Sequence, residues 1–243
     1  MISYRKLLEY GDKLSGIPYY IRSYKEFQSN PIVRQCIIKI MKQFDVYNKF
    51  LKFPDRYSAL RVKCPHCGLV KKKVNDIEIN GDELIIHSPC IHHGEYKVII
   101  TPENDKYFSM GMQLRDVTKG VLSFYLKPEK LNIMCDSRDW GGEWNNIVHC
   151  MTMKQLGIDQ ATDRIFTPLI IDNTGRKVSK SIYIQNGYSD LKKKEHFLDF
   201  EKFLSTYGDE GVKKIYYEVE KWAMIPCKTV RNYSLEYMSN CLK

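Results

Sequence analysis

Residues 61–100 read RVKCPHCGLVKKKVNDIEINGDELIIHSPCIHHGEYKVII and contain two candidate metal-ligand pairs of equal spacing. Cys64 and Cys67 form a CxxCG knuckle, and Cys90 and His93 repeat the two-residue gap further along. Two ligands at this spacing can reach one tetrahedral ion, because the tight turn between them points both side chains inward. A glycine follows each pair and suits such a turn. The stretch therefore predicts a Cys₃His zinc site.

The fourth ligand of this predicted site has alternatives. His92 and His87 are close enough in the sequence to replace His93. Two unrelated clusters of cysteine and histidine are a further alternative, which four candidate ligands at this spacing disfavour. A site closed by four protein ligands has no position for a water molecule, so we expect a structural zinc ion.

The sequence between the two pairs predicts a small antiparallel sheet. The turn NGD at 80–82 separates β-prone runs at 74–79 and 83–87, which is the pattern of a β-hairpin. Two knuckles that flank a hairpin form a zinc ribbon, and we expect it over residues 59–103.

Residues 1–58 and 191–243, on either side, show helical periodicity. In the clearest case, Asn30 is a candidate N-cap and Pro31 suits the first helical position. The apolar residues of one side of this helix are Ile32, Cys36, Ile37, Ile40, Met41 and Phe44. We expect this stripe to pack in the core, with Cys36 as a buried thiol that has no chemical role.

Residues 104–190 change to an α/β pattern. Apolar runs at 131–135 and 166–171 are strand candidates. Between them, residues 143–156 predict a helix that Gly157 ends. Strand, helix and strand form a βαβ unit.

The turn after the first of these strands reads SRDWGG (137–142). In α/β folds, ligands bind at the carboxyl ends of the strands. Gly141 would let a ligand approach the backbone, and Asp139 could accept hydrogen bonds from ribose hydroxyls. N-capping of the following helix is an equal alternative for Asp139.

The loop after the second strand reads GRKVSKS (175–181). Lys177 and Lys180 could neutralise charge that develops on a triphosphate, and Ser179 and Ser181 could hold the loop or contact phosphate. A polar surface turn is the alternative for seven residues of common types. The position after a buried strand favours phosphate handling.

The composition limits the class of protein. The 243 residues carry a net charge of +9, which favours polyanionic partners, although a lysine-rich solvated surface would give the same charge. We expect a cytoplasmic protein, in which eight cysteines indicate metal binding and buried thiols rather than disulfides. No apolar run reaches the length of a membrane span and no signal peptide opens the sequence, so we expect no membrane association.

Together these motifs resemble those of class I aminoacyl-tRNA synthetases, and within that class the lysyl type. GRKVSKS is similar to the KMSKS signature, with Val178 in place of the methionine. SRDW falls where the family has a GKDH-like adenosine-binding turn, with Ser137 in place of a glycine and Trp140 in place of the histidine. The order of helices, CxxCG zinc insertion, acidic turn and KMSKS loop is also similar, over roughly residues 1–190.

The resemblance implies a Rossmann-type catalytic domain that activates an amino acid with Mg²⁺-ATP and can load a tRNA. Lysine as the amino acid is implied by the resemblance alone. Lys177 and Lys180 would stabilise the transition state. The residues at the nucleotide-binding positions are Ser137, Asp139, Gly141, Ser179 and Ser181.

The sequence departs from the family in lacking a HIGH motif. It also supplies two of the family's roughly five parallel strands, and such a pair leaves a hydrophobic edge open. A separate polypeptide with the HIGH half, a second copy or local helices would have to cover residues 131–135. The short sequence after the KMSKS-like loop leaves no room for the usual anticodon-binding domain.

We therefore expect an α/β fold, in which a partial Rossmann-type catalytic domain carries an inserted zinc ribbon and flanking helices. The first hypothesis is the C-terminal part of a split or truncated class I synthetase that is inactive without a protein partner carrying the HIGH half. The alternative is a non-catalytic zinc-ribbon module that binds RNA or a protein. A frameshifted fragment is a third possibility.

Overall fold

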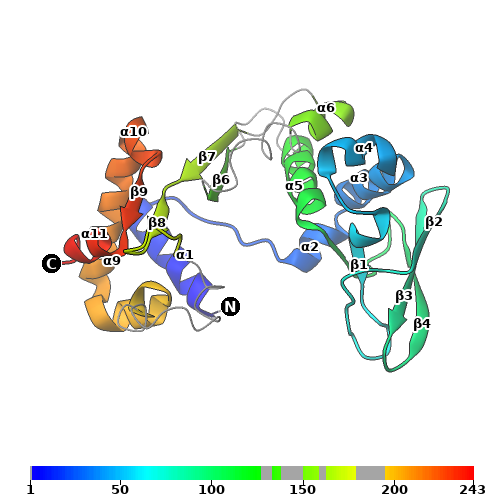
Figure 1. Cartoon of the computed structure of the whole chain (residues 1–243), viewed down its shortest axis with the longest axis horizontal. Helices are drawn as coiled ribbons and strands as arrows, with labels where there is room; N and C mark the ends of the chain where they lie inside the picture. The colour runs from blue at the N-terminus through cyan, green and yellow to red at the C-terminus, as the bar shows by residue number, and fades with distance from the viewer. Residues whose placement is uncertain (1, 127–132, 138–149, 159–162, 179–194) are drawn as a thin grey trace. The chain divides into compact units, whose positions relative to one another are not determined.

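The computed structural model mixes helices and strands and divides the chain into two compact units (Figure 1). The structure describes residues 2–126, 133–137, 150–158, 163–178 and 195–243. We name the two units by their place in the sequence. The terminal unit comprises Met1–Ile21, Cys135–Asp139 and Ile165–Lys243, and the central unit comprises Arg22–Met134 and Trp140–Arg164.

Helices begin both units. The first four are α1 (Ile2–Ser15) in the terminal unit, and α2 (Tyr24–Ser29), α3 (Pro31–Lys42) and α4 (Phe44–Leu51) in the central unit. The N-cap predicted for α3 is confirmed, because Asn30 Oδ1 accepts a hydrogen bond of 3.0 Å from the Ile32 N–H, with Pro31 at the first helical position. The predicted apolar stripe is also buried, except for Ile32, which is half-buried, and its last member, Phe44, begins α4.

The strands of the central unit form two antiparallel sheets. A three-stranded meander contains β2 (Asp76–Asn80), β3 (Glu83–Cys90) and β4 (Gly94–Ile100), and a separate pair contains β1 (Leu60–Val62) and β5 (Phe108–Met110). The hairpin predicted at 80–82 is confirmed, with Asn80 opposite Glu83. Alternate residues of β3 are buried, as expected for a sheet covered on one face.

One hydrophobic core joins this sheet to the helices. It contains Ile37 and Ile40 of α3 together with Leu84 and Ile86 of β3, and none of the four side chains is exposed. Helix α5 (Met112–Leu126) packs against α3 and adds Leu114, Val117 and Val121 to the same core. The metal-ligand segment and the helices beside it therefore belong to one packed unit, although their sequence patterns differ sharply.

Arg34 links α3 to the segment that follows β4. Its guanidinium is fully buried and donates to the backbone carbonyls of Thr101 at 3.0 Å and Lys106 at 2.6 Å, and to Asn104 Oδ1 at 2.7 Å. It also donates to the Gln28 carbonyl at 3.1 Å. A buried charge needs such a set of fixed acceptors, so Arg34 holds α3 and the segment after β4 in register.

In the segment predicted to form a βαβ unit, the observed strands differ from the predicted ones. β6 (Ile133–Ser137) begins two residues later than predicted, and the predicted run at 166–171 is interrupted at Pro168. It gives β7 (Asp163–Thr167), which pairs with β6, and β8 (Leu169–Ile171), which pairs elsewhere. Proline lacks the N–H that would continue a ladder, which accounts for the interruption.

The helix of the same segment is described only at its end, by α6 (Thr152–Gln155). The predicted C-cap at Gly157 is confirmed. Gly157 has φ 86°, its N–H bonds to the Lys154 carbonyl at 2.9 Å, and the Ile158 N–H bonds to the Met153 carbonyl at 3.0 Å. This pair of bonds is a Schellman motif.

The terminal unit is not purely helical after residue 190. Strand β9 (Asn232–Ser234) pairs in parallel with β8, so Ile170 lies opposite Tyr233. The helical elements here are η4 (Glu195–Phe197), α9 (Phe200–Met224), α10 (Pro226–Thr229) and α11 (Leu235–Asn240). Figure 1 shows α1 beside the long helix α9, which is broken at Gly208 with φ 61°.

None of the helices in the described ranges is both long enough and apolar enough to cross a bilayer.

Candidate functional site

The first knuckle is a tight turn closed by its own backbone. The Gly68 N–H bonds to the Cys64 carbonyl at 2.9 Å, and the Cys64 N–H bonds to the Leu69 carbonyl at 2.9 Å. Gly68 adopts φ 73°, a left-handed conformation that glycine accepts without a steric penalty. The turn thereby brings Cys64 and Cys67 to the same side.

The second knuckle is the turn between β3 and β4. Cys90 is the last residue of β3 and lies opposite Gly94, the first residue of β4. Gly94 has φ 71°, so it fills the same conformational role as Gly68. The hairpin register therefore fixes where Cys90 and His93 lie, because both belong to a turn whose strands are held along their length.

The two knuckles bring four ligand atoms together. The thiol sulfurs of Cys64, Cys67 and Cys90 and a ring nitrogen of His93 all lie within 4.8 Å of one another. The Cys67 Sγ to Cys90 Sγ distance is 3.5 Å, and His93 Nδ1 lies 3.7 Å from Cys64 Sγ and 3.6 Å from Cys90 Sγ.

These distances fit a metal ion. With Zn–S bonds of 2.3 Å and Zn–N bonds near 2.0 Å, the ligand atoms of a tetrahedron lie about 3.8 Å apart for two sulfurs and about 3.6 Å for sulfur and nitrogen. The three distances given above are close to these edges, so the cluster could hold a metal ion, and the donor set is compatible with zinc. In the described part of the chain, no second group of ligand side chains converges in this way.

Backbone N–H groups support the thiolates of this cluster. Burial opposes ionisation of Cys90, but N–H groups of His92 and His93, the His93 ring and the Cys67 thiol outweigh it and lower the pKa of Cys90 to about 6. The Leu69 N–H favours the Cys67 thiolate, yet burial and the neighbouring cysteines raise the pKa of Cys67 overall. Cys90 is thus the thiol most ready to ionise, and a bound cation would favour the thiolate form of its neighbour Cys67.

The structure favours His93 among the candidate fourth ligands. His87 lies within β3, and its Nε2 is 3.2 Å from Glu78 Oε1. His92 lies outside the cluster of four ligand atoms, with its ring centroid 6.3 Å from that of His93. With three cysteines and His93, a bound ion would have four protein ligands and no open position, which is the arrangement of a structural site.

The base of the GRKVSKS loop is the second candidate region, and Asp172 organises it. This carboxylate is 9% exposed, and its Oδ1 accepts hydrogen bonds from the Thr174 N–H at 2.8 Å, the Thr174 hydroxyl at 2.7 Å and the Arg176 N–H at 2.9 Å. The Asp172 N–H in turn bonds to the Arg176 carbonyl at 2.9 Å. Gly175 completes the turn with φ 79°.

The chain then folds back along β8. Ile171 and Lys177 form an antiparallel bridge, and the Val178 N–H bonds to the Ile170 carbonyl at 2.8 Å. The Val178 side chain packs with Ile170 and Leu235 in a small hydrophobic cluster. The first four residues of GRKVSKS are therefore held in a defined hairpin, and Lys177 is half-buried there.

The other predicted nucleotide-site residues are mostly outside the described residues. This applies to Asp139, Gly141, Ser179, Lys180 and Ser181. Ser137 is described only as the last residue of β6. Among the predicted nucleotide-site residues, Lys177 is thus the one that the described residues place in a defined turn, through its bridge to Ile171.

Asp172 was not among the predicted site residues. A signal for it exists in the sequence, because an aspartate directly after an apolar strand and three residues before a glycine is typical of a side-chain-stabilised turn. Arg34 was also missed, and no local pattern distinguishes it from the surface arginines and lysines of a helix.

No protein-family model matches the chain, and no curated protein sequence matches it either. Any functional assignment therefore rests on the residues of this chain and their geometry.

Proposed function

We propose that the chain contributes the KMSKS-loop half of an ATP-dependent amino-acid activation site of the class I, lysyl-type synthetase kind. The HIGH-containing half of that site would come from outside residues 1–243, on a protein partner. The observation that carries this proposal is the Asp172-centred hairpin, which fixes Gly175–Val178 directly after β8. Aspartate side chains stabilise many ordinary turns, so what links this turn to a nucleotide is the lysine- and serine-containing sequence that it begins.

In this proposal the lysines act on the triphosphate. Lys177, and Lys180 beyond the hairpin, would neutralise charge on the phosphates of Mg²⁺-ATP as pyrophosphate leaves. The described base of the loop is held by a buried aspartate, so Lys177 begins from a fixed position rather than from a flexible one. Such preorganisation lowers the cost of holding the lysine in place during the reaction.

Zinc is the ion proposed for the Cys₃His cluster. Thiolates and one imidazole at tetrahedral spacing are the ligand set that structural zinc prefers. When bound, the ion would supply structural stability and no reaction step. The four ligands would hold the two knuckles together as a zinc ribbon at the end of the β2–β3–β4 sheet.

Affinity labelling tests the nucleotide site directly. Adenosine triphosphopyridoxal carries an aldehyde at the phosphate end of the nucleotide, which forms a Schiff base with a lysine beside the phosphates, and borohydride then reduces the Schiff base to a stable secondary amine. We expect labelling of Lys177 or Lys180, found by peptide mapping and prevented by excess Mg²⁺-ATP. Lys177→Ala should lose the label at that position. Lys213→Ala is the matched control and should leave labelling of the loop unchanged, because Lys213 lies on α9, where it pairs with Glu210. Labelling that is unselective or insensitive to ATP would contradict the proposal.

An exchange assay tests the division of the site. The zinc-loaded chain alone should show no ATP–pyrophosphate exchange with lysine or any other amino acid, and exchange should appear with the HIGH-containing partner. Robust exchange by the chain alone would disprove the split arrangement.

A second candidate function is a non-catalytic module that binds RNA or a protein, and the knuckle surface favours it. Ile91 is 75% exposed and Leu69 39% exposed, beside the exposed His92 ring. The basic stretch Lys71 and Lys72 follows directly. Salt-sensitive RNA binding that is lost on changing both lysines to alanine, without any ATP labelling, would favour this function over the first.

A further inference from the structure

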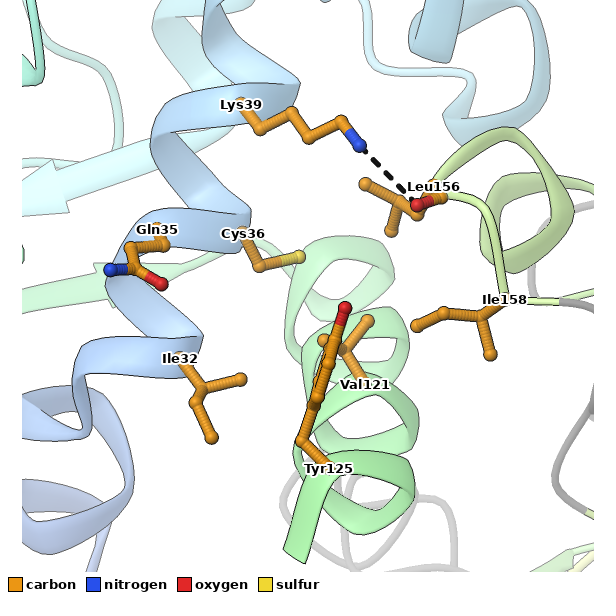
Figure 2. A pocket seen from close by; sticks show the side chains of 8 residues that line it. All are labelled: Ile32, Gln35, Cys36, Lys39, Val121, Tyr125, Leu156 and Ile158. Atoms are coloured by element: carbon orange, nitrogen blue, oxygen red, sulfur yellow. Dashed lines mark hydrogen bonds between the residues drawn. The ribbon is translucent and has the colours of Figure 1, made fainter. Parts of the chain in front are cut away.

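A pocket of about 370 Å³ lies between α3 and α5 in the central unit (Figure 2). Its volume is within the range of small-molecule sites, and none of the four metal-ligand candidates lines it. The lining residues are Ile32, Gln35, Cys36, Lys39, Val121, Tyr125, Leu156 and Ile158.

The walls of this pocket are mainly apolar. Figure 2 shows the Cys36 sulfur and the Ile158 side chain directed toward the space beside the Tyr125 ring. Ile158 and Val121 are each only 3% exposed, whereas Tyr125 is 56% exposed. The pocket thus combines an interior of aliphatic groups with an aromatic side chain that remains open to solvent.

One charged group lies at the edge of this apolar space. Lys39 Nζ donates to the Leu156 carbonyl at 3.3 Å, which uses one of its three N–H groups. Within the described residues, no aspartate or glutamate forms an ion pair with Lys39. The ammonium therefore has capacity to bind an anion.

Cys36 does not supply that anion. Burial raises the pKa of the Cys36 thiol to about 12, and the opposing effect of Lys39 is smaller. The thiol is therefore neutral at physiological pH and contributes a small apolar surface to the wall. A single cation beside an apolar cavity suits a monoanion with a hydrocarbon body better than a phosphate dianion, which needs several donors.

We propose that this pocket binds a small aliphatic carboxylate, with its carboxylate on Lys39 and its hydrocarbon body between Cys36, Val121 and Ile158. The site is separate from the proposed activation site and does not depend on it. Binding would join α3, α5 and the segment after α6 through one ligand.

Octanoate and 1-octanol are the probes for a test on the zinc-loaded full chain. They share a hydrocarbon body, so titration calorimetry with both separates the contribution of the charge from that of the apolar wall. We expect saturable binding of octanoate, about threefold to tenfold tighter than that of octanol, because a partly exposed ion pair contributes modestly. Absence of saturable octanoate binding, or equal affinity for octanol, would overturn the proposal.

Two variants on α3 locate the charge. Lys39→Met should reduce the affinity for octanoate to that for octanol and leave octanol binding unchanged. Lys42→Met is the matched control on the same helix, since Lys42 pairs with Asp82 at 2.7 Å and does not line the pocket. An equal loss with both variants would assign the effect to net charge and contradict the specific pairing.

A third variant locates the hydrocarbon body. Val121→Phe should fill the cavity and weaken both octanoate and octanol at least tenfold, provided that thermal unfolding remains cooperative. If this buried substitution prevents folding, Ile32→Phe at the half-buried edge makes the same test. Unchanged binding in a folded, filled variant would place the ligand elsewhere and overturn the assignment.

Discussion

The metal centre of the central unit and the GRKVSKS base of the terminal unit are both glycine-containing turns, but they are completed in different ways. The metal centre joins the turn that follows β1 to the turn between β3 and β4, and its four ligands lie between Cys64 and His93. The loop base depends on β8, whose parallel partner β9 follows about a quarter of the chain later at Asn232–Ser234. A local site can be read from spacing, whereas a site completed by a distant strand cannot.

Among the variants proposed here, one that cannot bind the metal should show the largest loss of stability. Cys90→Ala removes a buried ligand, and structural zinc contributes about 10–16 kcal/mol of apparent binding free energy in small zinc domains. We expect one zinc per wild-type chain and none stably bound in the variant, measured by elemental analysis after dialysis. Because β3 shares its core with α3, the thermal unfolding midpoint of the central unit should fall as well.

Cys227→Ser is the control for this experiment, because Cys227 is exposed and belongs to the terminal unit. It should retain the full zinc content. A Cys90→Ala protein with unchanged zinc content would show that another group completes the site, and the structural assignment of Cys90 would then be wrong.

Arg34→Met should have the next largest effect. The substitution keeps the apolar stem but leaves the carbonyls of Thr101 and Lys106 without their donor at partly buried positions. We expect a loss of about 3 kcal/mol in the free energy of unfolding, since each orphaned acceptor costs about 1–3 kcal/mol and partial exposure keeps the cost of each toward the lower value. Urea unfolding of the zinc-loaded chain measures the loss.

Arg22→Met, at an exposed position before α2, is the comparison for Arg34. An effect of similar size in both variants would mean that the hydrogen bonds of Arg34 do not link α3 to the segment after β4.

The contrast between the metal ligands and Arg34 explains which features could be predicted from the sequence. The ligand pairs, the 80–82 hairpin and the Asn30 cap depend on residues a few positions apart, so their spacing specifies them. Arg34 binds acceptors almost seventy positions away, and no periodicity indicates which arginine of a helix will be buried. The same reason accounts for β9, because a three-residue strand between helices has no pattern of its own.

The strands of the predicted βαβ unit show a related limit. The apolar run at 166–171 was correctly identified as strand-forming, but Pro168 divides it between two sheets. The hydrophobicity of the run predicted that its residues would be in strands. It could not predict the sheets that they join, because the partner strands β6 and β9 lie elsewhere in the sequence. The Rossmann-type arrangement therefore remains a proposal, whereas the convergence of the four metal ligands is observed.

Asp172→Ala tests the base of the GRKVSKS loop, and we expect its effect on stability to be smaller than that of Arg34→Met. The change removes three hydrogen bonds to one largely buried oxygen, and the Thr174 and Arg176 N–H groups lose their acceptor. We expect a loss of about 2 kcal/mol in local stability, seen as faster amide hydrogen exchange at residues 172–178. Zinc content should not change.

Asn173→Ala is the matched control, because Asn173 is exposed in the same turn. If both variants leave the exchange rates unchanged, the turn does not depend on the aspartate, and the observation that carries the proposed function fails. If Asp172→Ala also abolishes ATP-dependent labelling of the loop lysines, the structural and functional roles of the turn are linked.

The smallest expected effect concerns Glu218, beside the Trp222–Tyr233 stack of the terminal unit. The stacked rings lie 3.8 Å apart between centroids, and Trp222 Nε1 donates to Glu218 Oε1 at 2.9 Å. Burial alone would raise the pKa of Glu218, but hydrogen bonds from Tyr237, Trp222 and Lys221 outweigh it and hold the pKa below its ordinary value of 4.5. The carboxylate therefore favours the folded state when it is ionised.

The sign of the pH dependence follows from that lowered pKa. The stabilisation is fully present above the ordinary value of 4.5 and is lost as the pH falls through the lower folded-state value, because the unfolded chain binds the proton first. Glu218→Gln should unfold a few degrees below wild type at pH 7, and the difference should shrink steadily below pH 4.5. Glu220→Gln, at an exposed position of α9, should show no such convergence. A Glu218→Gln difference that stays constant with pH would mean that its charge does not contribute, and that hydrogen-bond geometry alone holds this end of the β8–β9 sheet against α9.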